Sequence, residues 1–590
     1  MESKRIKLSH AVDIPIPPPA VPAPMPAPAR APPSSNAFLR EDEPDVDLAL
    51  VRRCGVVSTP LPFQRASIHC MLRMKNVALF DGMGLGKTFQ VLCAIRTHPP
   101  SHAFVADAVK AGRYRGNTLI VCPKIVQAQW IEQYERHLSP RHPTAHRALM
   151  YTAKTAAKLS PLDLCAYEII VVTYDFLRSI STKNSALISL QYWRVVLDEV
   201  HCVKNYASKR FEVIDTLECT RRIALSGTPL HNTLTDVFPI LRFFRMFKGT
   251  LPGAFAEWRT RVLIPLEANR VAEAYTVVQT LLQPCIIRRL KTSVWRGQPL
   301  LQGLPAKTYT TIEVPMTTSE DGAYNAIEKG CVKRGVLLDA STLAPGESGY
   351  EGFRKLSKLR LCCVDAALSA RRGVREDVVC AACEDAPALR TLACACTVCA
   401  LCTPVEGRCR ACDAPFAVLN EHKTESPTPV EPHVMPSSKL KALEAYIRNA
   451  PRNDKIIVFS SWVMVLDSIQ ASCDLGVTAR LDGRMNQTQR AGQLDKFRNT
   501  HRVLLMTFGA GSTGIDLTCA NHVIFVDPHW SPAIEMQAED RAYRIGQTKP
   551  VHIIHLIQKR RDGKGTIEHV VRGVQRRKRT AMHALFETHC

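Results

Sequence analysis

The chain has 590 residues, more than one hydrophobic core normally organises, so we expect three or four domains of about 150 residues each. Its hydrophobic share of 46% is that of a globular protein, and no apolar run approaches the roughly 20 residues that a bilayer span requires. The formal net charge of +23 opposes compactness and favours a polyanionic partner over a surface that is basic only for solubility.

The first 45 residues are expected to form a disordered, proline-rich basic tail. Residues 11–35 contain ten prolines, a composition that cannot build a packed core. The cluster Lys4, Arg5 and Lys7 fits part of a nuclear import signal and fits a chance cluster equally well. Because no secretory signal is expected here, the 22 cysteines are predicted to be thiols or metal ligands, not disulfides.

Short apolar runs alternate with longer mixed stretches in two parts of the chain, the pattern of parallel sheets covered by helices. The predicted class is therefore α/β, with two parallel-sheet lobes. Residues 46–305 form lobe 1 and 439–590 lobe 2; between them we expect a helical region (306–375), a cysteine-rich module (376–416) and a linker (417–438).

A phosphate-binding loop is predicted directly after the first strand of lobe 1. The run after that strand is Asp81, Gly82, Met83, Gly84, Leu85, Gly86, Lys87 and Thr88, followed by a helical pattern. In this context backbone N–H groups and the helix N-terminus bind phosphates, Lys87 reaches the β- and γ-oxygens, and Thr88 helps to hold Mg²⁺. Asp81 stands where the usual motif has its first glycine.

A carboxylate pair completes the predicted hydrolysis site. Asp198 and Glu199 come directly after the apolar strand that ends at Leu197. A carboxylate at a buried strand end can hold the metal, and the next one can polarise the attacking water. An isolated Asp-Glu pair is usually a solvated strand end, but together with the phosphate loop it predicts ATP hydrolysis with Mg²⁺.

Eight cysteines between positions 380 and 412 predict a zinc module between the lobes. Soft ligands at this density, largely in C-x2-C pairs, suit two tetrahedral Zn²⁺ ions, and metal binding would supply most of the folding energy of so short a segment. The alternative is a cysteine-rich structural knot without metal. The predicted ligands are Cys380, Cys383, Cys394, Cys396, Cys399, Cys402, Cys409 and Cys412.

From Leu61 to Val570 the sequence resembles the Swi/Snf family of superfamily-two helicase-like ATPases. The motifs that carry the resemblance are residues 81–88, 198–201, 226–232, 481–485, 514–517 and 537–547, in the order found in that family. The last of them contains Arg544-Ile545-Gly546-Gln547 and is the most specific. One departure is Gly82, where the family usually has Glu; we expect activity to survive it because Lys87 and Thr88 are intact.

The resemblance implies two RecA-like lobes and a set of residue roles. Gln64 would read the adenine, and Gln537 would also contact the nucleotide. Arg541 and Arg544 would act as arginine fingers that stabilise the transferring phosphate when the lobes close. Coupling of the phosphate state to lobe motion would fall to Ser226, Gly227, Thr228, Gly514 and Asp516.

The family grips the phosphodiester backbone of double-stranded DNA and tracks along it without unwinding it, which needs basic and hydroxyl groups but no sequence code. The positions that match are Lys124, Thr173 and Thr507. For the two threonines, a structural role at a strand end is the more common alternative.

The cysteine spacing resembles a RING finger, with Cys380, Cys383, Cys399 and Cys402 on one zinc and the other four on the second. Ligase activity is open, because Cys396, Ala381-Ala382 and Arg410 replace residues usual in that fold. A RING between the lobes points to the DNA-repair and transcription-factor-like branch of the family.

The predicted function is therefore an ATP-dependent double-stranded DNA translocase acting on chromatin, stalled forks or protein–DNA complexes. Expected partners are duplex DNA, nucleosomes or DNA-bound proteins and a ubiquitin-conjugating enzyme, with no membrane. The expected location is the nucleus, or a viral replication site if a virus encodes the chain. The alternative is a RING ubiquitin ligase or adaptor with the lobes as a DNA-docking scaffold; an RNA helicase is disfavoured by the Arg-Ile-Gly-Gln motif.

Overall fold

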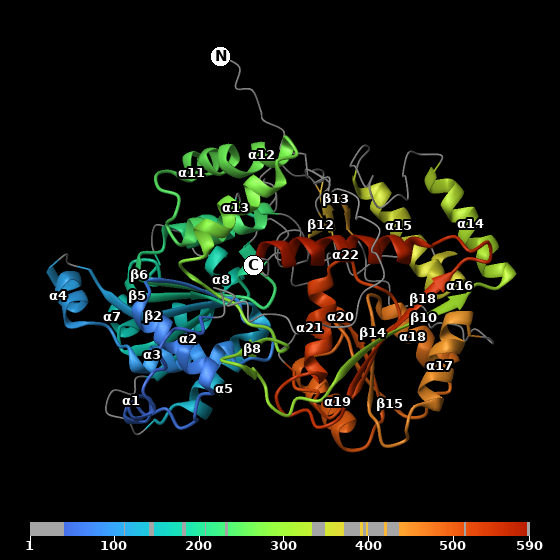
Figure 1. Ribbon diagram of the computed structural model, residues 1–590, viewed down its shortest axis with the longest axis horizontal. Helices are drawn as coiled ribbons and strands as arrows, with labels where there is room; N and C mark the ends of the chain where they lie inside the picture. Colours follow the sequence, from blue (N-terminus) through green and yellow to red (C-terminus); the bar gives the residue numbers. More distant parts are fainter. Residues whose placement is uncertain are drawn as a thin grey trace, which may run out of the picture. The chain divides into compact units, whose positions relative to one another are not determined.

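The computed structural model describes residues 40–110, 113–140, 147–179, 185–203, 205–206, 208–229, 234–332, 349–370, 390–392, 397–398, 418–421, 436–511 and 515–586. This part of the chain separates into two compact units (Figure 1). We call the unit of residues 40–304 and 578–586 lobe 1, and the unit of residues 305–577 lobe 2.

Lobe 1 is built on a seven-stranded parallel sheet with the order β3-β4-β2-β5-β6-β1-β7. The inner strands are runs of Val, Ile and Leu that are buried on both faces, as parallel strands under helices require. The strands are β1 (Asn76–Leu79), β2 (Arg115–Cys122), β3 (Arg147–Met150), β4 (Tyr167–Thr173), β5 (Gln191–Leu197), β6 (Cys219–Leu225) and β7 (Ile286–Ile287).

The pairing register aligns the carboxyl ends of three neighbouring strands, β5, β6 and β1. Leu197 of β5 pairs with Ala224 of β6, and Leu225 of β6 pairs with Leu79 of β1. The residues that follow β1, β5 and β6 therefore emerge side by side at the carboxyl edge of the sheet, where the predicted phosphate loop, carboxylate pair and Ser226 begin.

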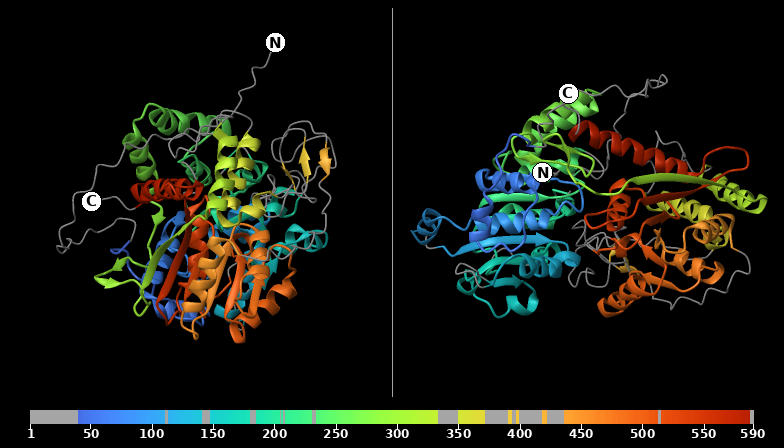
Figure 2. Two further views of the ribbon diagram at one scale, coloured as in Figure 1. Left: turned by 90° about the vertical axis from the view of Figure 1, so that its right-hand side faces the viewer. Right: turned by 60° about the horizontal axis from the view of Figure 1, so that its bottom comes forward.

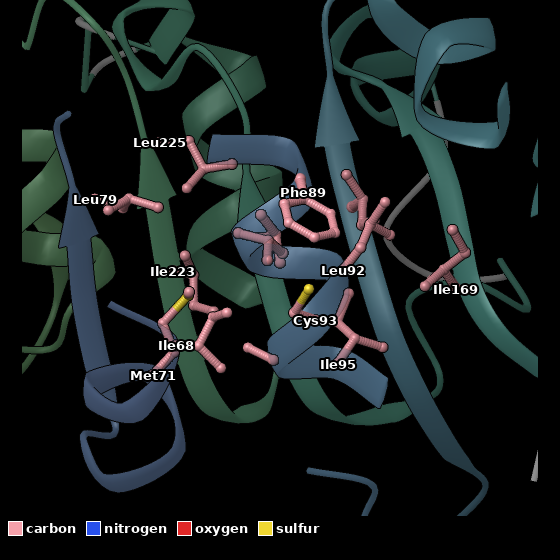
Figure 3. Packing of buried hydrophobic residues seen from close by; sticks show 14 of the residues in the cluster. Ile68, Met71, Leu79, Phe89, Leu92, Cys93, Ile95, Ile169, Ile223 and Leu225 are labelled. Carbon is pink, nitrogen blue, oxygen red and sulfur yellow. The ribbon is translucent and has the colours of Figure 1, made fainter. Parts of the chain in front are cut away.

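The helices of lobe 1 cover this sheet and close its core (Figure 3). Ile68 and Met71 of α2 and Leu92 of α3 pack with Leu79 and Ile223 of the sheet in one buried cluster. The helices are α1 (Leu48–Arg53), α2 (Pro62–Arg73), α3 (Lys87–Thr97), α4 (His102–Lys110), α5 (Lys124–His137), α6 (Ala153–Ala156), α7 (Pro161–Leu164), α8 (Tyr174–Ser179), α9 (Lys209–Thr216), α10 (Phe238–Phe243), α11 (Leu251–Trp258), α12 (Ile264–Glu267) and α13 (Val271–Leu282); a hairpin, β8 (Val294–Trp295) and β9 (Gln298–Pro299), follows β7.

Lobe 2 has a six-stranded parallel sheet with the order β10-β18-β17-β14-β16-β15; the left view in Figure 2 shows red and orange strands of this sheet side by side. Its core joins Leu440 and Leu443 with Val458, Leu505 and Ile524. The strands are β10 (Lys307–Pro315), β14 (Ile456–Ser460), β15 (Thr478–Leu481), β16 (Val503–Thr507), β17 (His522–Phe525) and β18 (Val551–Lys559).

The helices of lobe 2 include the one that holds the predicted finger arginines, α21. They are α14 (Thr318–Val332), α15 (Gly349–Val364), α16 (Ala366–Ala370), α17 (Ser438–Asn449), α18 (Val463–Ser472), α19 (Gln487–Asn499), α20 (Phe508–Gly511), α21 (Pro532–Ala542) and α22 (Ile567–Phe586). The boundary between the two units falls within α22, after Arg577. Beyond it, Phe586 packs edge-on against Phe80, the residue after β1.

The domain boundaries differ from the expected ones at three places. Residues 307–315, expected to belong to a helical region, form β10 of the lobe 2 sheet, because most of this run is Thr, Tyr, Ile and Val, which favour a strand. Residues 578–586 group with lobe 1, not lobe 2. Residues 40–45, expected in the tail, contact lobe 1 through Arg40, which donates to the carbonyls of Gln283 and Ile286.

The rest of the predicted tail and the eight zinc-ligand cysteines lie outside the described residues. The described residues here form a three-stranded antiparallel sheet of β11 (Arg390–Leu392), β12 (Thr397–Val398) and β13 (Val418–Glu421). The first two strands lie within the cysteine-rich segment, whereas β13 lies in residues that were expected to form the linker. Across the described ranges, no helix is both long and apolar enough to cross a membrane.

Candidate nucleotide site

The phosphate loop has the geometry that an anion requires. It turns between β1 and α3 with Gly84 and Gly86 in the left-handed region, at φ of 78° and 75°. Helix α3 begins at Lys87 with no side-chain cap and no acidic residue in its first turn, so its first N–H groups remain for an anion. The Lys87 ammonium donates to the carbonyl oxygens of Asp81 at 2.8 Å and Gly82 at 3.3 Å, which holds it over the loop.

Gln64, the predicted adenine reader, is hydrogen-bonded to the phosphate loop. Its Oε1 accepts from the N–H of Leu61 at 2.9 Å, and its Nε2 donates to the carbonyl of Leu85 at 3.1 Å. A Cβ at Gly86 would lie only 2.6 Å from this Nε2, so the loop approaches Gln64 closely because position 86 has no side chain. The side chain is buried, and its adenine role stays a prediction.

Asp198 is fixed at the end of β5 by three neighbours. The Trp130 indole donates to Oδ2 at 2.8 Å, the Glu199 N–H donates to Oδ1 at 3.0 Å, and the Tyr174 hydroxyl donates to the Asp198 carbonyl at 2.8 Å. Burial, reinforced by the Glu199 carboxylate, raises the pKa of Asp198 to about 7, against the opposing effects of the Trp130 hydrogen bond and the Lys87 ammonium. A cation bound at this carboxylate would restore its charge.

Glu199 stands on a strained backbone and connects to the third motif. Its φ of 47° lies in the left-handed region, which a residue with a side chain adopts at a cost that functional sites often carry. His201 Nδ1 lies 3.4 Å from Glu199 Oε2 and 3.4 Å from Ser226 Oγ, and Ser226 Oγ accepts from the Thr228 N–H at 3.0 Å. A chain of contacts thus joins the carboxylate pair to the predicted coupling segment.

The coupling segment also touches the phosphate loop directly. A Cβ at Gly227 would lie 2.5 Å from Cγ of Met83 and 3.4 Å from its backbone nitrogen. The loop after β6 can therefore lie against the phosphate loop only because residue 227 is glycine.

Arg289, which was not predicted from the sequence, connects the phosphate loop to α2. It is fully buried, donates to the carbonyl of Phe63 at 2.7 Å and to Ser67 Oγ at 2.6 Å, and lies 3.5 Å from Asp81 Oδ2. Its own carbonyl accepts from the Gly82 N–H at 2.7 Å. The Asp81 carboxylate therefore faces this buried arginine; the pair Arg288-Arg289 directly after an apolar strand was the available signal.

In lobe 2, α21 and the turn after it hold both predicted finger arginines. Arg541 lies in the last turn of α21, and its carbonyl accepts from the Leu517 N–H at 3.0 Å. Arg544 follows the helix and is half-buried. Gln547 is buried and donates to the carbonyls of Ala520 and Ala542 at 2.8 and 2.9 Å, so the end of the motif anchors the turn that carries Arg544.

Most of the remaining predicted positions lie at strand ends, at a helix start or on α21. The hydroxyls of Thr173 and Thr507 accept from the N–H groups of Phe176 at 3.1 Å and Ala510 at 3.4 Å, a structural role at each strand end, and their contact with DNA stays a prediction. Lys124 is exposed at the start of α5, Gln537 is buried on α21, and Asp516 accepts from Thr518 N at 3.0 Å. Gly514 lies outside the described residues.

These residues fit ATP and Mg²⁺. The uncapped start of α3 and the Lys87 ammonium suit phosphates, while the Asp198 carboxylate and the Thr88 hydroxyl are the oxygen donors that Mg²⁺ prefers. For zinc, the described residues contain no group of three or more His, Cys, Asp or Glu that could hold a metal, and the eight predicted ligand cysteines lie outside these residues.

Comparison with protein families decides the relationship. The model of the SNF2-related domain matches residues 63–367, and that of the helicase conserved C-terminal domain matches residues 438–546. The chain belongs to the SNF2-related family of helicase-like ATPases. The predicted resemblance is thereby confirmed.

Similar proteins are DNA repair proteins by name. RAD5A of Arabidopsis thaliana is 31% identical over 603 residues, covering 85% of this chain and 57% of the relative. Rad5 of Aspergillus fumigatus is 27% identical, covering 86% and 53%, and rad8 of Schizosaccharomyces pombe is 27% identical, covering 85% and 51%. The chain thus spans about half the length of the curated relatives it matches.

Among solved structures, the SWI2/SNF2 ATPase core of Sulfolobus solfataricus in complex with dsDNA is 21% identical, covering 91% of this chain and 98% of that one. Its TM-score is 0.37, too low to carry an argument.

Proposed function

We propose that this chain is an ATP-dependent translocase on double-stranded DNA. The observation that carries the proposal is the joined network in lobe 1, where the phosphate loop, the carboxylate pair and the coupling segment meet at one sheet edge. A scaffold that only docked on DNA would have no need of a strained Glu199 linked through His201 to Ser226.

In this proposal each residue has one physical task. The Lys87 ammonium leaves its two carbonyl partners for the phosphate oxygens, and Asp198, held by Trp130, keeps a fixed orientation toward the metal. Glu199 orients the attacking water. Loss of the terminal phosphate would change the contacts of Glu199, and His201, which contacts both Glu199 and Ser226, would transmit this change to the coupling segment.

Duplex DNA is the proposed track. The net charge of +23 supplies the phosphate attraction, and a motor that follows the backbone needs no base-reading side chains. Nucleosomes, stalled forks and other protein–DNA complexes are the proposed substrates, and the nucleus is the proposed location.

The decisive experiment separates a motor from a scaffold. ATPase activity should be low without nucleic acid and rise with duplex DNA more than with single strands or RNA, because a duplex track should favour the closed, hydrolysing state. The protein should also displace a triplex-forming strand from duplex DNA, with Lys87→Ala as the inactive control. Stimulated hydrolysis without any displacement would tell against the translocase and favour the scaffold.

A second candidate function rests on the cysteine-rich segment. Eight cysteines, largely in C-x2-C pairs, and a small three-stranded antiparallel sheet with two strands in the same segment support a RING-like module that binds two Zn²⁺ and docks a ubiquitin-conjugating enzyme. Elemental analysis should give about two zincs per chain. A ubiquitin-chain assay with a panel of conjugating enzymes then tests ligase activity, with Cys399→Ser as the control.

A further inference from the structure

The described chain passes between the two lobes twice. The first passage is at Leu304 and Pro305, and the second is within α22, between Arg577 and Lys578. Close to each passage, on the lobe 2 side, a polar side chain is hydrogen-bonded to a glutamate of the same helix, α21. This is the helix that carries Arg541 and leads to Arg544.

Near the first passage, the contact is made by the start of β10. The Lys307 ammonium donates to Glu539 Oε2 at 3.0 Å, and the Tyr309 hydroxyl donates to the same oxygen at 2.8 Å. The ammonium also lies 5.1 Å from the centre of the Tyr309 ring and 4.9 Å from that of Tyr543. Burial is the largest single effect and lowers the pKa of Lys307, but Glu539, Tyr309 and Asp540 together leave this pKa raised, so the lysine stays charged.

Near the second passage, the contact is made by α22. Gln575 is buried two residues before the boundary, and its Nε2 donates to Glu535 Oε1 at 2.7 Å and to the carbonyl of His529. Glu535 also accepts from the His529 N–H at 2.8 Å. Glu535 and Glu539 are four residues apart on α21, and both are almost fully buried, at 0% and 1% exposure.

Two buried carboxylates one turn apart are costly unless each is held by a partner. Here each partner stands within three residues of a passage between the lobes. A helix of 11 residues is stiff over its length of roughly 16 Å, so displacement at these glutamates moves the last turn, where Arg541 lies.

We propose that α21 is the element through which movement of the lobes reaches the finger arginines, with Lys307 and Gln575 as positioning residues that act on Glu539 and Glu535. The proposal rests on the function proposed above. Lys307 and Gln575 touch neither nucleotide nor DNA in this scheme; they set where Arg541 and Arg544 stand when the lobes change their arrangement.

The test uses variants of the full chain. Lys307→Met keeps the length of the side chain and removes the charge, and Glu539→Gln removes the acceptor charge. The matched control is Lys559→Met, which breaks the Lys559–Glu313 pair, an exposed ion pair of 2.7 Å that also involves β10 but joins it to β18 and not to α21. Because breaking a buried pair can destabilise lobe 2, Tyr309→Phe provides a milder variant that removes only one hydroxyl.

We expect Lys307→Met to lower the duplex-stimulated kcat by about tenfold, within the range of ordinary coupling between sites. The rate without DNA, the KM for ATP and the affinity for duplex should stay within about twofold, since the nucleotide cradle lies in lobe 1. The double variant Lys307→Met/Glu539→Gln should lose no more than the worse single variant, because both remove one interaction. Tyr309→Phe should show the same selective loss to a smaller degree, and Gln575→Leu should repeat it at the second passage.

The results separate the inference from the proposed function. Wild-type stimulation by duplex with undiminished stimulation in Lys307→Met and Tyr309→Phe overturns the inference alone. A fall of stimulated and unstimulated rates by the same factor does so as well, because it shows a role in stability only. A wild-type rate that ignores duplex DNA contradicts the proposed function, and the inference then falls with it.

Discussion

The two lobes are built on the same kind of parallel sheet but present different chemistry at the carboxyl edge. In lobe 1, that edge gathers a lysine, two carboxylates and a hydroxyl into one connected network, with Lys87, Asp198, Glu199 and Ser226 as its members. In lobe 2, Thr507 at the end of β16 accepts a hydrogen bond from a backbone N–H. The predicted finger arginines, Arg541 and Arg544, lie on α21 and in the turn after it.

The difference indicates how binding and catalysis are divided. Lobe 1 has the groups that hold phosphates in the ground state, whereas the proposed fingers of lobe 2 supply positive charge that matters when charge develops on the transferring phosphate. Changes to the phosphate-binding groups of lobe 1, such as Lys87, should therefore alter nucleotide binding as well as turnover, and changes at α21 should alter turnover alone.

The largest expected effect comes from Arg544→Ala. Loss of an arginine finger costs on the order of 10³-fold or more in kcat. The KM for ATP should change little, and duplex affinity, set mainly by phosphate contacts, should stay within a few-fold. The comparison is Arg448→Ala, an exposed arginine of α17 in the same lobe, which should behave as wild type. A parallel rise in the KM for ATP would show that Arg544 also contacts the nucleotide in the ground state, and would contradict the division between the two lobes.

Glu199→Gln should cost on the order of 10²- to 10⁴-fold in kcat, because it removes the carboxylate that orients the water. ATP and duplex binding should survive, since Lys87 and the start of α3 are untouched. Equilibrium binding of labelled ATP beside a steady-state ATPase assay separates the two quantities. Glu257→Gln, an exposed carboxylate of lobe 1, is the control. Near-normal turnover in Glu199→Gln would remove the assignment.

Gly227→Ala should have a smaller effect that is confined to lobe 1. The added methyl would meet Met83 at 2.5 Å and push on the phosphate loop. We expect a loss of about 1–3 kcal/mol in the free energy of unfolding, as for overpacking elsewhere, together with a raised KM for ATP. Adding Met83→Ala should relieve the clash and recover most of the loss; thermal melts and KM values that ignore the second change would contradict this account.

Much of this arrangement could be predicted from the sequence because the signals are local. A strand, a glycine-rich turn and a helix lie within residues 76–97, and the Asp-Glu pair lies at the end of an apolar run, so chemistry and secondary structure were readable together. The parallel sheets followed from runs of Val, Ile and Leu that need cover on both faces.

The parts that escaped prediction depend on contacts between distant residues. Trp130 reaches Asp198 across 68 positions, Arg289 reaches Ser67 across 222, and Lys307 reaches Glu539 across 232. No periodicity encodes such pairs. The strand β10 was missed because it is a mostly exposed edge strand with no regular apolar pattern, and its pairing with β18 joins residues 307–315 to 551–559.

The smallest expected effect concerns acid and again distinguishes the lobes. Burial, together with the nearby charges of Arg221 and Arg194, lowers the pKa of His98 to about 4, and the ring packs edge-on against Trp193 in lobe 1. His98 is therefore neutral in the folded state at a pH where the unfolded chain, with a pKa near 6.5, is protonated. The unfolded state then binds more protons, so stability is complete above pH 6.5 and falls as the pH drops toward 4. Since His98 is only half-buried, the loss of unfolding free energy at pH 5 should be about 1 kcal/mol after allowance for solvent screening.

Urea unfolding at pH 7 and pH 5, followed by hydrogen exchange in peptides of lobe 1, measures this loss. The variant His98→Gln should flatten the dependence of stability on pH, and the exposed His102→Gln should not. An equal flattening in the peptides of lobe 2 would mean that the acid effect belongs to the whole chain and not to lobe 1.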